Sequence, residues 1–262
     1  MDLLARLQAP VAALAAGIWL LAAAAVAQDF AIDNEVFRGQ ESQPLQRTTT
    51  VFYQDRVYDL VHTTGQAAVF DPAAASFVLL HPLAPEREPT GGVQTEIPLV
   101  QLDRLVLQLK QELARRKDAR LRCLAQPRPQ FQSTPPTWRL ATRWLEYQVR
   151  PLEAPGAQVA QRYYEFIRWS TRLAALQSPT MLLRLELNRR LEQQRQIPQE
   201  ITLLVYGAGP LGLRRPEGAL RSRHRYHWQL RPRDHQQVAR IQKQLAAFRR
   251  VSWREFHRLE KQ

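Results

Sequence analysis

The sequence is poor in cysteine, and this limits how the protein can be stabilised. Cys123 is the single cysteine among 262 residues. One thiol cannot form a disulfide within the chain, so a folded domain must depend on packing alone. Arginines flank Cys123, but no histidine signature of a reactive cysteine accompanies it. We therefore interpret it as an inert thiol.

The sequence also lacks the short motifs of enzyme chemistry. It contains no Gly-x-Ser-x-Gly elbow, no His-Glu-x-x-His zinc motif and no Walker phosphate loop. Its six histidines are scattered along the chain, a distribution that predicts neither a metal site nor a cofactor. These absences favour a non-catalytic protein. The alternative is an enzyme whose catalytic residues come together only in space.

Lysine is scarce as well, although the chain is strongly basic. Only four of the 37 basic residues are lysines, the formal net charge is +13, and most arginines follow residue 100. Base composition can produce such an arginine bias as readily as phosphate recognition can. Outside the cytoplasm, a basic surface meets anionic lipid headgroups, cell-surface polymers or acidic proteins. An anionic envelope surface is therefore one expected partner, and nucleic acid is not.

The N-terminus carries the longest apolar run. Residues 11–26 are uncharged, follow Arg6 and end in Ala25-Val26-Ala27, the small-x-small pattern of a signal peptidase site. The run is shorter than the roughly 20 residues that span a bilayer comfortably. We predict a signal peptide over residues 1–27 and export to the periplasm or beyond. The alternative is an uncleaved helix that anchors the protein to the membrane.

Residues 48–80 predict an antiparallel meander. Four short runs of β-branched and aromatic residues are separated by turn-forming residues at 54–56, 64–65 and 71–72. In the run at 57–61, Tyr58 and Leu60 share one face and Asp59 lies on the other, the pattern of a sheet covered on one side and solvated on the other.

Leucines and aromatics at helical spacing predict covering helices around 99–113, 159–176 and 238–248. We expect an α+β fold in which an antiparallel sheet, flat or curved into a half-barrel, is covered on one face by these helices. Residues 126–136 hold four prolines and predict a junction between 28–125 and 137–262, two parts expected to pack as one domain. A strand with a bulge is expected at 138–149.

The segment 221–230 predicts a strand with two distinct faces. Arg221, Arg223 and Arg225 share one face, where they either bind an anion or form an ordinary solvated surface. His224 and His227 point to opposite faces, so they cannot chelate one metal ion together.

The order of elements from residue 30 to 113 resembles the half-barrel proteins of the periplasmic lipoprotein-carrier family. The resemblance lies in the Tyr-Asp-Leu hairpin and in the Val-Phe-Asp-Pro and Phe-Val-Leu-Leu strand pair, which is also similar to that of exported planctomycete-type bacterial proteins. It implies an apolar concave sheet face, closed by helices, that shelters an acyl chain or an apolar peptide.

These observations together predict an exported binding or envelope-associated protein with an apolar ligand or lipid. The side chains expected to line one sheet face around that ligand are Phe52, Tyr58, Phe77, Tyr226 and Trp228. Two alternatives stay open. One is a hydrolase of envelope polymers that uses two carboxylates from among Asp59, Asp71, Glu146 and Glu165. The other is a structural protein docked on an anionic surface through its basic second half.

Overall fold

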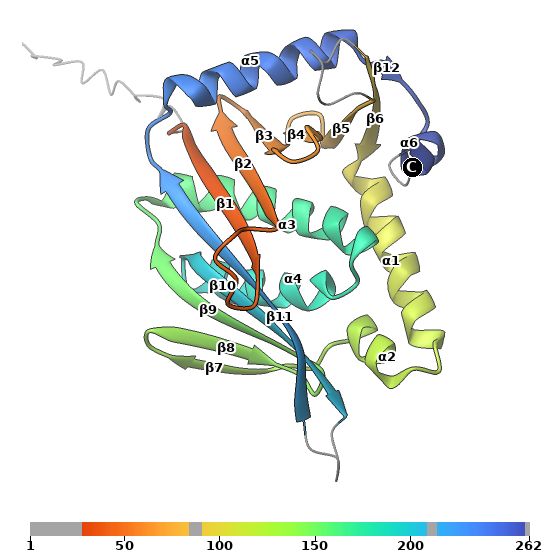
Figure 1. Ribbon diagram of the computed structural model, residues 1–262, viewed down its shortest axis with the longest axis vertical. Coiled ribbons are helices and arrows are strands. Elements are labelled where there is room, and N and C mark those ends of the chain that lie inside the picture. The colour runs from red at the N-terminus through yellow and green to blue at the C-terminus, as the bar shows by residue number, and fades with distance from the viewer. Residues whose placement is uncertain (1–27, 84–90, 209–213, 260–262) are drawn as a thin grey trace, which may run out of the picture.

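The computed structural model describes residues 28–83, 91–208 and 214–259, and it shows one open sheet with helices on both of its faces (Figure 1). The predicted signal peptide lies outside the described residues. No helix among the described residues has both the length and the hydropathy of a membrane span. The antiparallel α+β class expected from the sequence is confirmed.

The first six strands form a meander, of which the second to the fifth are the four strands expected at 48–80, and the sixth leads into a helix. They are β1 (Phe30–Arg38), β2 (Gln46–Tyr53), β3 (Arg56–Val61), β4 (Ala67–Asp71), β5 (Ser76–Pro82) and β6 (Gly92–Pro98). The remaining strands are β7 (Gln130–Thr134), β8 (Thr137–Ala141), β9 (Leu145–Glu153), β10 (Gln196–Ala208), β11 (Arg214–His227) and β12 (Arg249–Arg250).

The two parts of the chain share this sheet. The strand order is β12-β6-β5-β4-β3-β2-β1-β11-β10-β9-β8-β7, and every neighbouring pair is antiparallel except β12 and β6. Strand β1 pairs with β2 on one side and with β11 on the other. The first strand of the described chain therefore lies in the middle of the sheet.

Six helices accompany the sheet in the part of the chain that the structure describes. They are α1 (Leu99–Arg115), α2 (Ala119–Ala125), α3 (Ala157–Gln177), α4 (Met181–Gln193), α5 (Pro232–Ala247) and α6 (Trp253–Leu259). Figure 1 shows α3 and α4 behind the strands, α1 along one side and α5 across the top.

The sheet face toward α1, α3 and α4, here called the inner face, carries the main core. Directly opposed residues on neighbouring strands build a row of large apolar side chains across it: Phe52, Val57, Phe70, Phe77 and Ile97. Phe166 of α3 packs on this row, with its ring centroid 5.6 Å from that of Phe52. Burying each such side chain contributes about 1.5–3 kcal/mol, so this row fixes α3 against the sheet.

The opposite sheet face, here called the outer face, is covered at one end by α5. Val238 and Ile241 of α5 pack against Val51, Tyr58 and Leu60. The expectation that all three predicted helices cover one face is therefore wrong for 238–248. The reason is visible in β3, where Val57 and Tyr58 are both apolar and point to opposite faces, so both faces need a cover.

Two further segments differ from the sequence-based expectation. The junction predicted at 126–136 contains the edge strand β7, which pairs with β8. The single bulged strand predicted at 138–149 is the hairpin of β8 and β9. Its turn is closed by Thr142, whose side chain accepts hydrogen bonds from the backbone N–H of Trp144 and of Leu145. The alternation of apolar and polar residues shifts by one position at residue 144 because the chain turns there between two strands, and not because one strand has a bulge.

Candidate functional site

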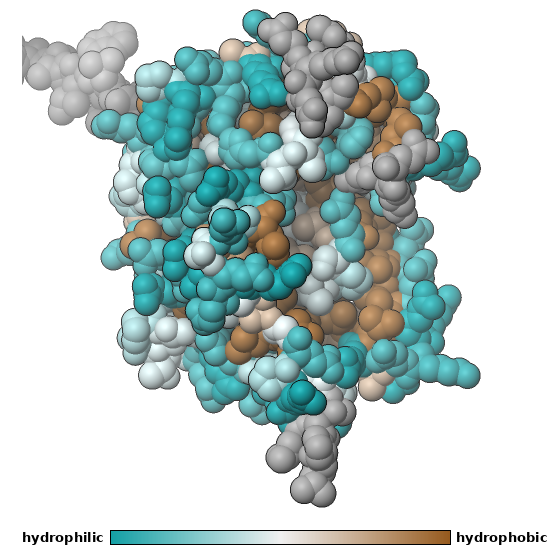
Figure 2. All heavy atoms as spheres, in the orientation of Figure 1, coloured by the Kyte–Doolittle hydropathy of each residue, from teal (hydrophilic) through white to brown (hydrophobic). Residues whose placement is uncertain are grey.

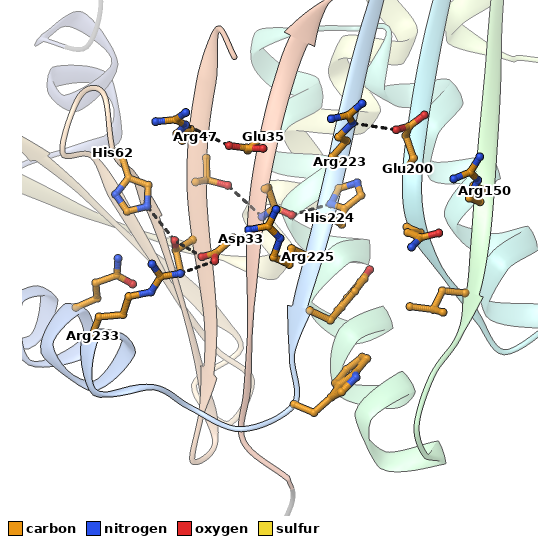
Figure 3. Close-up of a pocket in the computed structure, with 18 residues that line it drawn as sticks. Asp33, Glu35, Arg47, His62, Arg150, Glu200, Arg223, His224, Arg225 and Arg233 are labelled. Carbon is orange, nitrogen blue, oxygen red and sulfur yellow. Dashed lines mark hydrogen bonds and ion pairs between the residues drawn. The ribbon is translucent and has the colours of Figure 1, made fainter. Parts of the chain in front are cut away.

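A charged groove of about 750 Å³ lies on the part of the outer face that α5 leaves open (Figure 3). Its floor is a row of side chains that alternate in sign across five strands, in the order Arg47, Glu35, Arg223, Glu200 and Arg150. Each member is directly opposed to the next in the register of the strands, so all five point to the same face. We call this row the charge ladder.

The charge ladder is only partly neutralised by its own ion pairs. Arg47 lies 3.2 Å from Glu35, and Arg223 lies 3.2 Å from Glu200. Exposed pairs of this kind contribute about 0–1 kcal/mol each. Arg150, at the end of the ladder, takes part in no ion pair or side-chain hydrogen bond of the described residues. It therefore contributes uncompensated positive charge to the groove.

Asp33 is a hub of hydrogen bonds at the end of the groove nearest α5. Its carboxylate accepts from Thr49 at 2.9 Å, from Arg231 at 3.0 Å and from Arg233 at 2.6 Å. His227 Nε2 lies 2.8 Å from the same carboxylate. Burial alone would raise the pKa of Asp33, but these hydrogen bonds and the Arg231 charge outweigh it and lower the pKa to about 2.

The Thr49 hydroxyl beside Asp33 is held by two hydrogen bonds. Thr49 Oγ1 also lies 2.9 Å from His62 Nε2. Because Thr49 donates its proton to the carboxylate of Asp33, the His62 nitrogen must be the donor toward Thr49 and cannot act as its base. Thr49 is therefore not an activated nucleophile.

The three arginines predicted to bind an anion have different surroundings. Arg221 lies over the ring of Phe37, at 5.0 Å, outside the groove lining. Arg223 lines the groove within the charge ladder. Arg225 also lines it, is exposed, and takes part in no ion pair or side-chain hydrogen bond of the described residues. Arg225 and Arg150 are thus the groove's two cations left for an anion to bind.

A second, apolar cavity of about 290 Å³, here called the inner cavity, lies between β3–β5, α3 and α6. Figure 2 shows apolar side chains gathered in a hollow beside α1, whereas the surface over β1, β2 and β11 is hydrophilic. The large apolar side chains that line the inner cavity are Phe77, Leu79, Leu80, Phe166, Leu173, Leu176, Trp253 and Phe256.

Among the described residues, Asp59 is the only carboxylate that lines the inner cavity, and no lysine or arginine lines it. Thr50 Oγ1 donates a hydrogen bond of 2.7 Å to its Oδ1. Burial raises the pKa of Asp59 to about 6, although the residue keeps some exposure toward the cavity. The expectation that Asp59 points to solvent is wrong, because the solvated face of β3 does not exist: α5 covers one side and α3 the other.

Of the five aromatic residues predicted to line one face, four lie on the inner face, and Tyr58 alone lies on the outer face. Tyr58 lies under α5 on the outer face, and Phe52 is stacked on Phe30 in the core, with ring centroids 4.1 Å apart. Tyr226 and Trp228 stack on each other at 5.1 Å against the inner core, and both also reach the lining of the charged groove. Phe77 alone lines the inner cavity.

The four carboxylates of the hydrolase alternative do not share a cleft. Asp59 faces the inner cavity, whereas Asp71 is paired with Arg56 in the β4–β5 turn. Glu146 accepts from Arg139 on the outer face, and Glu165 is exposed on α3. Within the described ranges, no three His, Cys, Asp or Glu side chains gather as a metal site.

The chain matches no protein family and no curated protein. Its function must therefore be inferred from the groove and the cavity themselves.

Proposed function

We propose that the protein is a non-catalytic binding protein that holds an apolar ligand in the inner cavity. The observation that carries this proposal is the lining of that cavity, where aromatic and leucine side chains surround a few polar groups. This is the usual composition of a ligand pocket, and the volume is near the lower end of the range for such pockets, about 300–1,000 Å³. The resemblance to half-barrel lipoprotein carriers, which implies a shelter for an acyl chain or an apolar peptide, supports the same class of ligand.

A short acyl chain suits the dimensions of the inner cavity. Each buried methylene contributes about 0.8 kcal/mol, so a ten-carbon chain gains roughly 8 kcal/mol before the cost of lost ligand freedom, about 4 kcal/mol or more. The net gain of about 4 kcal/mol corresponds to a dissociation constant on the order of 1 mM for a simple ten-carbon probe.

A cavity-filling variant tests the proposal. Ala174 of α3 lines the inner cavity, and Ala239 is exposed on α5. Calorimetric titration of the purified protein with 1-decanol should show binding that Ala174→Phe weakens at least tenfold and that the matched control Ala239→Phe leaves unchanged. Absence of binding, or equal binding by both variants, would contradict the proposal.

We further propose that binding takes place outside the cytoplasm, after removal of residues 1–27. The apolar run and the Ala25-Val26-Ala27 pattern support this location. N-terminal sequencing of protein expressed in a Gram-negative host should find Gln28 as the first residue. Soluble protein that retains Met1 would contradict export.

A second candidate function, favoured by the two unpaired arginines of the groove, is docking on an anionic envelope surface. Arg225 and Arg150 are exposed and line the groove beside the charge ladder. Cosedimentation with anionic vesicles should decrease as salt shortens the Debye length below about 8 Å, and Arg225→Gln with Arg150→Gln should weaken it. Arg104→Gln on the exposed side of α1 is a matched control. Salt-independent binding would contradict this function.

A further inference from the structure

The inner face of the sheet carries a chain of hydrogen bonds that crosses four strands and ends at Asp59. His224 of β11 lies 2.6 Å from Asn34 Oδ1 of β1, and Asn34 Nδ2 lies 3.2 Å from Thr50 Oγ1 of β2. Thr50 in turn donates to Asp59 of β3. We call these four residues the cross-strand chain.

The direction of every hydrogen bond in the cross-strand chain follows from its two ends. The carboxylate of Asp59 can only accept, so Thr50 is the donor there and must accept from the Asn34 amide. The amide oxygen of Asn34 then requires a proton from His224 Nδ1. Burial lowers the pKa of His224 to about 3, so its imidazole is neutral and holds one proton, which this hydrogen bond places on Nδ1.

In the cross-strand chain, one carboxylate oxygen of Asp59 accepts a hydrogen bond and the other does not. Oδ1 receives the Thr50 hydroxyl, and Oδ2 accepts no hydrogen bond from the described residues. The other titratable group that lines the inner cavity is His257, whose ring stacks on Trp253 at 5.9 Å. Asp59 itself takes part in no ion pair of the described residues, so its carboxylate has no counter-charge among them.

An unpaired carboxylate in apolar surroundings is costly, and a ligand cation removes that cost. An ammonium group offers both the opposite charge and short N–H donors for Oδ2. We propose that the inner cavity selects amphiphiles with a cationic amine end, which Asp59 receives while the apolar tail packs along Phe77 and Phe166. This inference rests on the proposed function and adds the chemical class of the ligand.

Three ten-carbon probes that differ only in their polar end test the selectivity. Calorimetric titrations at pH 7.5 with decylammonium, 1-decanol and decanoate, each below its micelle concentration, should rank affinity in that order. A charged hydrogen bond justifies an advantage of about tenfold or more for decylammonium over 1-decanol. The net charge of +13 attracts anions in general, so a preference for the cation must arise locally.

Variants separate the role of the carboxylate from that of the fold. Asp59→Asn should bring the three affinities within about threefold of one another, because the amide removes the charge and keeps the shape. Asp71→Asn makes the same chemical change in a turn outside the cavity lining and should keep the wild-type ranking. Thr50→Val removes the last donor of the cross-strand chain and keeps the carboxylate, so the preference for the amine should persist.

The outcomes distinguish this inference from the proposed function. Equal binding of the three probes by the wild type, or an amine preference that survives Asp59→Asn, would overturn the amine selectivity and leave apolar binding intact. Failure of all three probes to bind would overturn both.

Discussion

Asp234 lies fully buried beneath Arg231, and its carboxylate accepts hydrogen bonds from both the backbone and the guanidinium of that arginine. The backbone N–H of Arg231 is 2.8 Å from Asp234 Oδ2, and Arg231 Nη2 is 2.8 Å from Oδ1. This contact starts α5 and ties it to the end of β11. Asp33 of β1 accepts a hydrogen bond from the same guanidinium, so Arg231 connects α5 to the middle of the sheet.

Asp234→Ala should destabilise the protein by about 2–4 kcal/mol, because it removes a helix cap and leaves a partly buried arginine with one carboxylate fewer. Equilibrium unfolding in urea measures the change. Asp103→Ala is the matched control, since Asp103 forms an exposed ion pair with Arg172 and should cost less than about 1 kcal/mol. Equal losses in the two variants would contradict the importance of this contact.

Gly92→Ala should also destabilise the protein, by about 1–3 kcal/mol. A Cβ at Gly92 would overlap the ring of Phe248, which closes the end of α5 over β6, whereas a Cβ at Gly91 meets nothing within 4 Å. Thermal unfolding of Gly92→Ala and of the control Gly91→Ala compares the two. Phe248→Leu in the Gly92→Ala background should recover part of the loss, and strict additivity of the two changes would exclude the steric explanation.

The stability of the protein should fall as pH rises from about 4 to 6, through the contribution of Asp59. Burial raises the pKa of Asp59 from 3.8 to about 6 in the folded protein. The folded state then binds a proton more tightly than the unfolded state, so this contribution is complete below pH 4 and is lost as pH rises through 6. The loss is on the order of 2–3 kcal/mol.

Asp59→Asn isolates this contribution. Urea unfolding between pH 4 and 6 should show a weaker decrease with pH in the variant than in the wild type. Asp33 is the internal contrast, because its pKa is lowered to about 2 and its contribution is lost only as pH falls from about 4 to 2. An unchanged pH dependence in Asp59→Asn would mean that the carboxylate is solvated.

Glu35→Gln should change stability little and should strengthen anion binding at the groove. Glu35 lies between Arg47 and Arg223 in the charge ladder, and its ion pair with Arg47 is exposed and worth at most about 1 kcal/mol. The variant leaves those two arginines without the intervening negative charge, so cosedimentation with anionic vesicles should increase. Glu112→Gln on α1 removes the same charge elsewhere and serves as the control. A large loss of stability in Glu35→Gln would instead indicate that the charge ladder stabilises the fold.

The parts of the fold that were predictable from the sequence depend on local patterns. The meander at 48–80 follows from side-chain alternation and turn residues that lie next to each other in the chain. His224 and His227 were expected on opposite faces, and the structure confirms it: one contacts Asn34 on the inner face and the other contacts Asp33 on the outer face.

The candidate sites depend on the register between distant strands, which no local pattern reveals. Glu35 and Arg223 become neighbours only because β1 pairs with β11, and Thr50 reaches Asp59 only through the register of β2 and β3. Because Asp59 is charged, the sequence favoured a solvated position for it. The apolar residues next to it in β3 were the only indication that both faces of this strand are covered by helices. Nothing in the sequence around Arg47, Glu200 and Arg150 indicated that their side chains lie on the same face of the sheet.

The central position of β1 also sets the order in which the sheet can be completed. A chain that emerges N-terminus first presents β1 at the start and its partner β11 near the end, with Ala31 opposite His227. Until that late strand arrives, β1 and β2 form a hairpin with one open edge, and an open edge invites pairing with other chains. Contacts between such distant segments also slow folding. The free edge of β1 therefore stays open to association with other chains until β11 has been made and paired with it.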